Sequence, residues 1–174
     1  MDQLSYSIKK SKNSCRNQSL GRVISWETSP SGIIGQCEAG YFCISIFRDD
    51  IIRVQASRYS EFETNPYTVV QKAINSAFSF EQFPDQLIIH TSKIQLKVDL
   101  ESFRLHFFDQ KGRLLNADDQ LGISWIGTEV SVYKEVQKGE RFIGLGEKTG
   151  NLDRSGRAYT NWNTDYFGYG IGDD

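Results

Sequence analysis

The sequence is poor in residues that mark a disulfide scaffold, a metal site or a membrane span. Its 174 residues include three cysteines, two histidines, three prolines and one methionine. Cys15, Cys37 and Cys43 are odd in number and show no C-x-x-C spacing, so we expect reduced thiols, no bound metal and no cofactor. No apolar run approaches the roughly 18–20 residues that a spanning helix requires, so no membrane partner is expected.

Excess charge of either sign is also missing. Twenty Lys and Arg residues stand against 22 Asp and Glu residues, for a formal net charge of −2. A nucleic-acid interface needs excess positive charge on one face, so this balance argues against nucleic acid as a partner. The first residues, MDQLSYSIKKSKNSC, have no apolar stretch behind their lysine pair and are not a secretory signal. With reduced thiols, this favours a cytoplasmic protein, or a periplasmic or secreted one if a signal has been removed.

Aromatic residues, in contrast, are abundant, with 11 Phe, 8 Tyr and 3 Trp making up 13% of the chain. Apolar and polar side chains alternate along much of the sequence. The pattern is clearest in residues 41–47 and 93–99, where every second residue is apolar: Phe42, Ile44, Ile46, Ile94, Leu96 and Val98. Such alternation is typical of strands with one buried face, because successive side chains leave opposite faces of a sheet.

The whole chain is predicted to be all-β. About ten to twelve short strands are expected, at residues 22–26, 33–38, 41–47, 52–56, 67–70, 77–80, 87–91, 93–99, 103–107, 122–125 and 129–135. The acidic pairs Asp49-Asp50 and Asp118-Asp119 are expected in turns, where aspartate accepts hydrogen bonds from backbone amides. No segment has a convincing helical pattern, and no composition shift divides the chain. We therefore predict one domain over residues 1–174, an antiparallel β-sandwich.

Two candidate chemical motifs fail in detail. Residues 144–149 (GLGEKT) suggest a phosphate-binding loop, but a Walker loop requires glycine immediately before its lysine, and Glu147 precedes Lys148. His90 and His106 lie in separate predicted strands and belong to no metal or nucleophile pattern, so we expect structural roles for both.

The last part of the chain, residues 139–174, has a different amino-acid composition. It holds eight of the 15 glycines, mixed with tyrosine, asparagine and aspartate, and is expected to form a shaped loop surface. Within it, Trp162, Asn163, Thr164 and Asp165 are candidate sugar-binding residues. A carboxylate accepts hydrogen bonds from vicinal hydroxyls, an amide both donates and accepts, and aromatic rings cover the apolar face of a pyranose. Composition alone leaves open an alternative in which these rings fill one end of the sandwich.

The motifs of this segment resemble glycoside hydrolase family 31, the retaining α-glucosidases and α-xylosidases. The resemblance rests on residues 139–148 (GERFIGLGEK), a hairpin at residues 150–156 and Trp162-Asn163-Thr164-Asp165 (WNTD), and more loosely on residues 42–56 and 95–109 with the turn at Gly112. It implies a β-sandwich of the galactose-mutarotase-like type, packed in the full-length protein against a (β/α)8 barrel. That barrel would carry the two catalytic aspartates of the family.

The resemblance also implies a division of labour. The chain contains no barrel sequence, so we expect a fragment of a longer α-glucosidase, inactive alone, whose segment 139–174 leads toward the barrel. Asp165 would bind hydroxyls of an α-linked oligosaccharide, while Trp162, Asn163 and Thr164 shape the loop. Two alternatives remain at this point: a free-standing carbohydrate-binding β-sandwich, and an aldose epimerase on the related fold.

Overall fold

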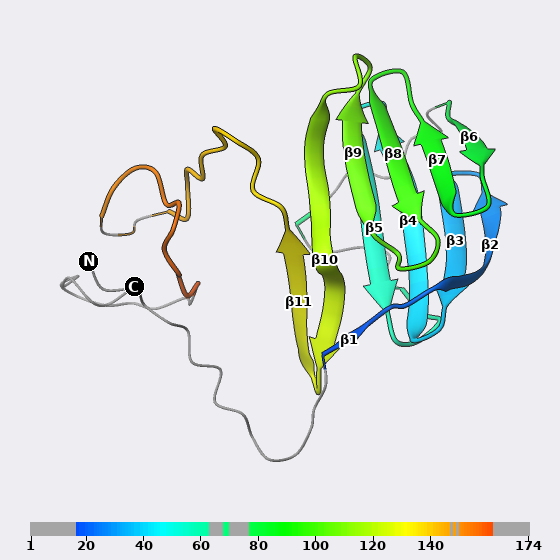
Figure 1. Cartoon of the computed structure of the whole chain (residues 1–174), viewed down its shortest axis with the longest axis horizontal. Helices are drawn as coiled ribbons and strands as arrows, with labels where there is room; N and C mark the ends of the chain where they lie inside the picture. The colour runs from blue at the N-terminus through cyan, green and yellow to red at the C-terminus, as the bar shows by residue number, and fades with distance from the viewer. Residues whose placement is uncertain (1–16, 63–67, 70–76, 147, 149, 162–174) are drawn as a thin grey trace. The chain divides into compact units, whose positions relative to one another are not determined.

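The computed structural model describes residues 17–62, 68–69, 77–146, 148 and 150–161 (Figure 1). The chain divides into two units, Met1–Glu135 and Val136–Asp174, which are described separately below. The first unit holds all eleven strands found among the described residues, and those residues include no helix. The prediction of an all-β antiparallel fold is confirmed, whereas the single domain over residues 1–174 stays a prediction.

One sheet of the first unit has seven strands, all antiparallel to their neighbours. Its order is β1-β10-β9-β8-β7-β6, and β11 pairs with the other edge of β10 (Figure 1). The bounds are β1 Gln18–Ser19, β6 Ser79–Gln82, β7 Gln86–His90, β8 Ile94–Asp99, β9 Leu105–Asp109, β10 Leu114–Ile126 and β11 Glu129–Lys134. β1 and β9 share one edge of the long strand β10, because β1 pairs with residues near its end and β9 with residues near its beginning.

The second sheet is a meander of four antiparallel strands in the order β2-β3-β4-β5. The strands are β2 Val23–Ser29, β3 Gly32–Cys37, β4 Gly40–Arg48 and β5 Ile51–Ser57. The strands predicted over residues 41–47 and 52–56 are therefore confirmed as β4 and β5, with the predicted turn at Asp49-Asp50 between them.

The two sheets pack face to face around one hydrophobic core (Figure 1). Phe42, Ile44 and Ile46 of β4 are at most 1% exposed, which confirms the face predicted from their alternation. The opposite sheet supplies a matching row that includes Leu87, Ile89, Leu96, Val98 and Leu105. The ring of Phe42 meets that of Phe103 across the core at a centroid distance of 4.5 Å. These contacts define a β-sandwich with a mainly aliphatic core, which places the polar side chains of each sheet on its outer face.

The predicted turn at Asp118-Asp119 is wrong, because both residues lie inside β10. The Asp118 side chain is buried, where one carboxylate oxygen accepts a hydrogen bond from the Leu105 amide at 3.0 Å and the other binds the Lys134 ammonium group of β11. The pairing of β10 with β11 shifts register between Asp118 and Ile123, where Gly122 has a φ of +49°. The two donors satisfy both carboxylate oxygens, which lets a charged residue occupy a buried strand position beside this bulge.

Two other predicted strands differ from the structure. The strand expected over residues 103–107 begins only at Leu105, because Phe103 has a φ of +45°, outside the β region. In the stretch 67–70, Thr68 and Val69 lie outside any strand, and Tyr67 and Val70 are not among the described residues. The turn expected at Gly112 is confirmed, and Gly112 there has a φ of +77°.

Candidate functional site

The second unit contains a hollow of about 500 Å³ along the segment that carries the GERFIGLGEK motif. Its lining combines apolar side chains with arginines: Phe142, Ile143, Leu145, Tyr159, Arg141, Arg154 and Arg157, together with Ser155 and Gly156. Phe142, Ile143 and Leu145 are exposed. Residues 139–161 therefore form an open surface of rings, aliphatic groups and cationic groups.

A turn around Asp153 ties the two ends of this segment together. One Asp153 carboxylate oxygen accepts hydrogen bonds from the Ser155 hydroxyl at 2.5 Å and from the Ser155 amide at 3.0 Å, with a longer one from the Phe142 amide at 3.4 Å. The Arg154 amide in turn donates to the Phe142 carbonyl at 2.7 Å. Two hydrogen bonds hold the pKa of Asp153 below its usual range. The one from the Ser155 hydroxyl has the larger effect and the one from the Ser155 amide the next. Asp153 is thus ionised at neutral pH and fixes the turn.

Arg154 is the buried cation of this loop, with 9% of its surface exposed. Its guanidinium donates to the Lys148 carbonyl at 3.0 Å and lies 5.5 Å from the ring centroid of Tyr159. The Lys148 ammonium group donates in turn to the Thr160 carbonyl at 3.0 Å. Charge-assisted hydrogen bonds and a cation–π contact therefore connect residues 148, 154, 159 and 160.

The glycines of the GLG motif serve the path of the backbone. Gly144, Leu145 and Gly146 have φ values of +133°, +68° and +69°, three successive residues in a region that favours glycine. A side chain at Gly150 would also lie 2.7 Å from the Arg157 guanidinium. The described part of the motif that suggested a phosphate loop, residues 144–146, is therefore a backbone bend, and Lys148 donates to a carbonyl of the same loop.

The four predicted sugar-binding residues, Trp162, Asn163, Thr164 and Asp165, lie outside the described residues, so their role stays a prediction. The structure describes the loop that leads directly to them and ends at Asn161. The hairpin expected at residues 150–156 is a turn at Ser155-Gly156, with no strand among its described residues.

Sequence reasoning missed Arg154. The only signal was an arginine placed between turn-forming residues, with Tyr159 five residues later, a pattern too common to identify a buried cation.

The remaining titratable candidates form no second centre. His90 Nε2 lies 3.4 Å from the Glu81 carboxylate on the neighbouring strand, and His106 pairs with Lys97 across β8 and β9. Cys37 and Cys43 are free thiols, and burial raises the pKa of Cys37 to about 12, while Cys15 is outside the described residues. Within the described ranges, no three His, Cys, Asp or Glu residues are grouped as a metal site would require, and no helix is long and apolar enough to cross a membrane.

Residues 41–174 match a family model described as the glycosyl hydrolase 31 N-terminal galactose mutarotase-like domain. The matched region covers most of the chain and includes the loop of residues 139–161 and the WNTD motif at residues 162–165.

Three relatives are informative. Alpha-glucosidase 2 of Bacillus thermoamyloliquefaciens is 29% identical over 133 residues, covering 75% of this chain and 17% of that protein. A family 31 dextranase of Flavobacterium johnsoniae, solved with glucose, superposes with a TM-score of 0.81 at 26% identity, covering 90% of this chain and 20% of that one. A family 31 α-xylosidase of Xanthomonas citri shares the fold, with a TM-score of 0.62 at 18% identity over 75% of this chain and 16% of its own. The chain thus spans about a fifth or less of each relative.

Proposed function

Because the chain belongs to the N-terminal galactose mutarotase-like domains of glycosyl hydrolase 31, we propose that it works within a longer retaining α-glycosidase. The observation that carries this proposal is the family match over residues 41–174, which agrees with the resemblance of the C-terminal motifs and with the β-sandwich. The resemblance to family 31 and the galactose-mutarotase-like fold are confirmed. The activity of the longer protein is the proposal.

The proposed substrate is an α-linked glucoside. The relatives at 26% and 29% identity are named a dextranase and an alpha-glucosidase, and the dextranase has been solved with glucose and, as a variant, with isomaltotriose. The α-xylosidase, at 18% identity, supports the fold alone. Glucose is therefore favoured over xylose at the cleaved position.

In this proposal the chain binds and orients sugar while a catalytic barrel cleaves it. Retaining hydrolysis uses two carboxylates roughly 5 Å apart, one as nucleophile and one as general acid and base, and the barrel would supply both. Asp165 would accept hydrogen bonds from vicinal hydroxyls of the substrate, with Trp162, Asn163 and Thr164 shaping the loop. The network around Arg154 supports this role, because it fixes the backbone up to the residues that precede the motif.

Hydrolysis of p-nitrophenyl α-glucoside tests the proposal. The full-length protein that contains this domain should release nitrophenol from the α-glucoside and none from the β-anomer. The 174-residue chain alone should show no turnover, because it lacks the carboxylate pair. Turnover by the isolated chain, or β-anomer cleavage by the full-length protein, would contradict the proposed division of labour.

A further inference from the structure

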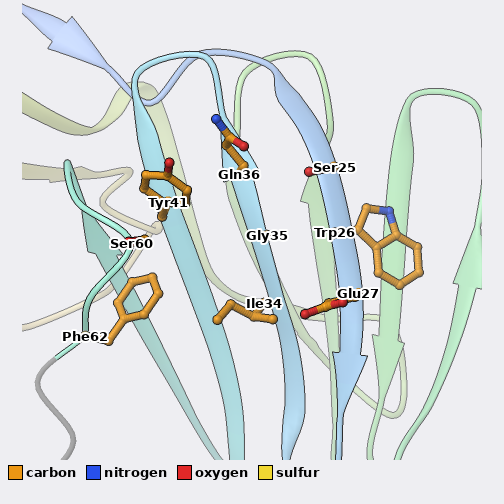
Figure 2. A pocket seen from close by; sticks show the side chains of 9 residues that line it. All are labelled: Ser25, Trp26, Glu27, Ile34, Gly35, Gln36, Tyr41, Ser60 and Phe62. Carbon is orange, nitrogen blue, oxygen red and sulfur yellow. The ribbon is translucent and has the colours of Figure 1, made fainter.

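A second hollow, of about 300 Å³, lies on the outer face of the four-stranded sheet in the first unit (Figure 2). Its lining includes Ser25 and Glu27 of β2, Ile34 and Gln36 of β3, Tyr41 of β4, and Phe62 after β5. These strand residues alternate with Ile33, Cys37 and Phe42, which are buried on the core side. The hollow is therefore a surface feature separated from the core by the sheet itself.

Aromatic and polar groups surround this hollow, with the Trp26 ring on the same side as Glu27 (Figure 2). Figure 2 shows the rings of Tyr41 and Phe62 on one side, the Glu27 carboxylate on the opposite side, and Ile34 and Gln36 between them. Strand register explains the placement, because Glu27 pairs with Ile34 and Gln36 pairs with Tyr41. Neighbouring strands thus bring an acid, an aliphatic side chain, an amide and a phenol onto one patch.

The polar side chains of the hollow do not take part in the hydrogen bonds and ion pairs that the described residues form with one another. Within the described part of the chain, the side chains of Glu27, Gln36 and Tyr41 make no hydrogen bond or ion pair. The buried and half-buried aspartates of the same unit behave differently: Asp99 binds Arg104 and Asp118 binds Lys134. Glu27 and Gln36 are exposed, so their oxygen and nitrogen atoms are free to bind a ligand.

This combination of groups matches a neutral pyranose. A carboxylate and an amide bind vicinal hydroxyls, while a tyrosine and a phenylalanine ring pack against the C–H face of a sugar ring. Glu27 is the one charged group among the described residues that line the hollow, which disfavours a phosphate or carboxylate ligand. The volume is at the lower end of the roughly 300–1,000 Å³ typical of small-molecule sites, which suits a short glycan.

We propose that this hollow binds a glycosyl unit of a neutral oligosaccharide. This site goes beyond the proposed function, since it lies in the first unit and uses residues other than those of the WNTD motif. Ser25, Glu27, Ile34 and Gln36 precede residue 41, where the family match begins, so the site draws most of its polar groups from outside the matched region.

A titration of the ¹⁵N-labelled 174-residue chain with isomaltotriose tests this site. We expect saturable amide shifts at residues 25–27, 34–36 and 41, with half-saturation of about 1 mM. Glu27→Gln removes a charged acceptor without changing its size, and Tyr41→Ala removes a ring. Each should weaken binding about tenfold or more. Glucose 6-phosphate should bind more weakly than glucose, because the Glu27 carboxylate repels its negatively charged phosphate.

Matched controls lie on the other sheet. Glu129→Gln and Tyr133→Ala remove the same groups from exposed positions of β11 and should bind isomaltotriose as the wild type does. An absence of saturable shifts at about ten times the expected half-saturation concentration would overturn the proposal. So would equal affinity of the isosteric Glu27→Gln variant, or shifts confined to residues 136–161. That last pattern would favour sugar binding by the second unit and leave the proposed hydrolase function standing.

Discussion

The buried contact between Asp118 of β10 and Lys134 of β11 gives the sharpest stability prediction. The Asp118 side chain is fully buried and that of Lys134 is 36% exposed. The Asp118 carboxylate also accepts the Leu105 amide at 3.0 Å and so connects β10 to both β9 and β11. Lys134 is the last residue of β11, two residues before the second unit begins at Val136. Removing either partner should therefore loosen the end of the sheet.

The two single variants should differ in cost. Lys134→Ala leaves a buried carboxylate without its cation, and breaking a buried pair in this way costs about 3–5 kcal/mol. Asp118→Ala leaves the Leu105 amide unpaired, but the Lys134 ammonium group can reach water, so we expect the lower end of that range, about 3 kcal/mol. The double variant Asp118→Leu/Lys134→Met removes both charges and keeps apolar bulk, so it should cost less than the sum of the two single variants.

Urea unfolding followed by tryptophan fluorescence measures these differences, and an unchanged m-value ensures that the same transition is compared. Lys93→Ala is the control, because it removes an exposed ion pair with Asp50 and should leave the midpoint nearly unchanged. If Lys134→Ala shifts the midpoint no more than Lys93→Ala does, the assignment of Asp118 as a buried, charged strand connector is wrong.

Three further predictions concern other parts of the chain. Burial raises the pKa of Asp99, but hydrogen bonds from Arg104, Ser102 and the Glu101 amide outweigh it and leave the pKa below its usual 3.8. Its contribution to stability is therefore present at neutral pH and lost as the pH falls through the folded pKa, so Asp99→Asn should lower the unfolding free energy at pH 7 and flatten its decline in acid. With a pKa of about 12, the Cys37 thiol should resist alkylation at pH 8 until the chain unfolds. Mass spectrometry measures the alkylation, and alkylation of Cys37 in the folded chain would contradict its burial. Arg154→Met should keep apolar contact with Tyr159 but lose the hydrogen bond to the Lys148 carbonyl. Amide hydrogen exchange should therefore become faster in residues 142–154 and stay unchanged in β3 and β4. Unchanged protection of the loop would show that Arg154 does not stabilise it.

The alternation of apolar residues was enough to predict the β-sandwich. Phe42, Ile44 and Ile46 face the core because period-two alternation specifies both the strand and its buried face. The pattern failed where a local backbone feature interrupts a strand. Phe103 keeps its place in the core through a positive φ, and Asp118 is buried because the Leu105 amide and the Lys134 ammonium group satisfy its carboxylate. Neither feature is visible in composition or periodicity.

The sugar-binding role of the WNTD motif stays a prediction, because its residues lie outside the described part of the chain. The buried position of Arg154 could not be predicted, because it depends on carbonyl and ring contacts that form only when the loop folds. The outer hollow was missed for a related reason. Glu27, Gln36 and Tyr41 are separated in sequence and meet only through the register of β2, β3 and β4.

Under the proposed function, this domain supplies a sugar-binding carboxylate to a family 31 glycosidase. The most direct measurement is kcat/KM of the full-length protein on isomaltotriose after Asp165→Ala, with Asp173→Ala as a control that removes a carboxylate from the same segment. Loss of a charged hydrogen-bond partner predicts a decrease worth about 1–3 kcal/mol for Asp165→Ala and little change for the control. Unchanged kcat/KM in Asp165→Ala, or equal losses in both variants, would contradict the claim.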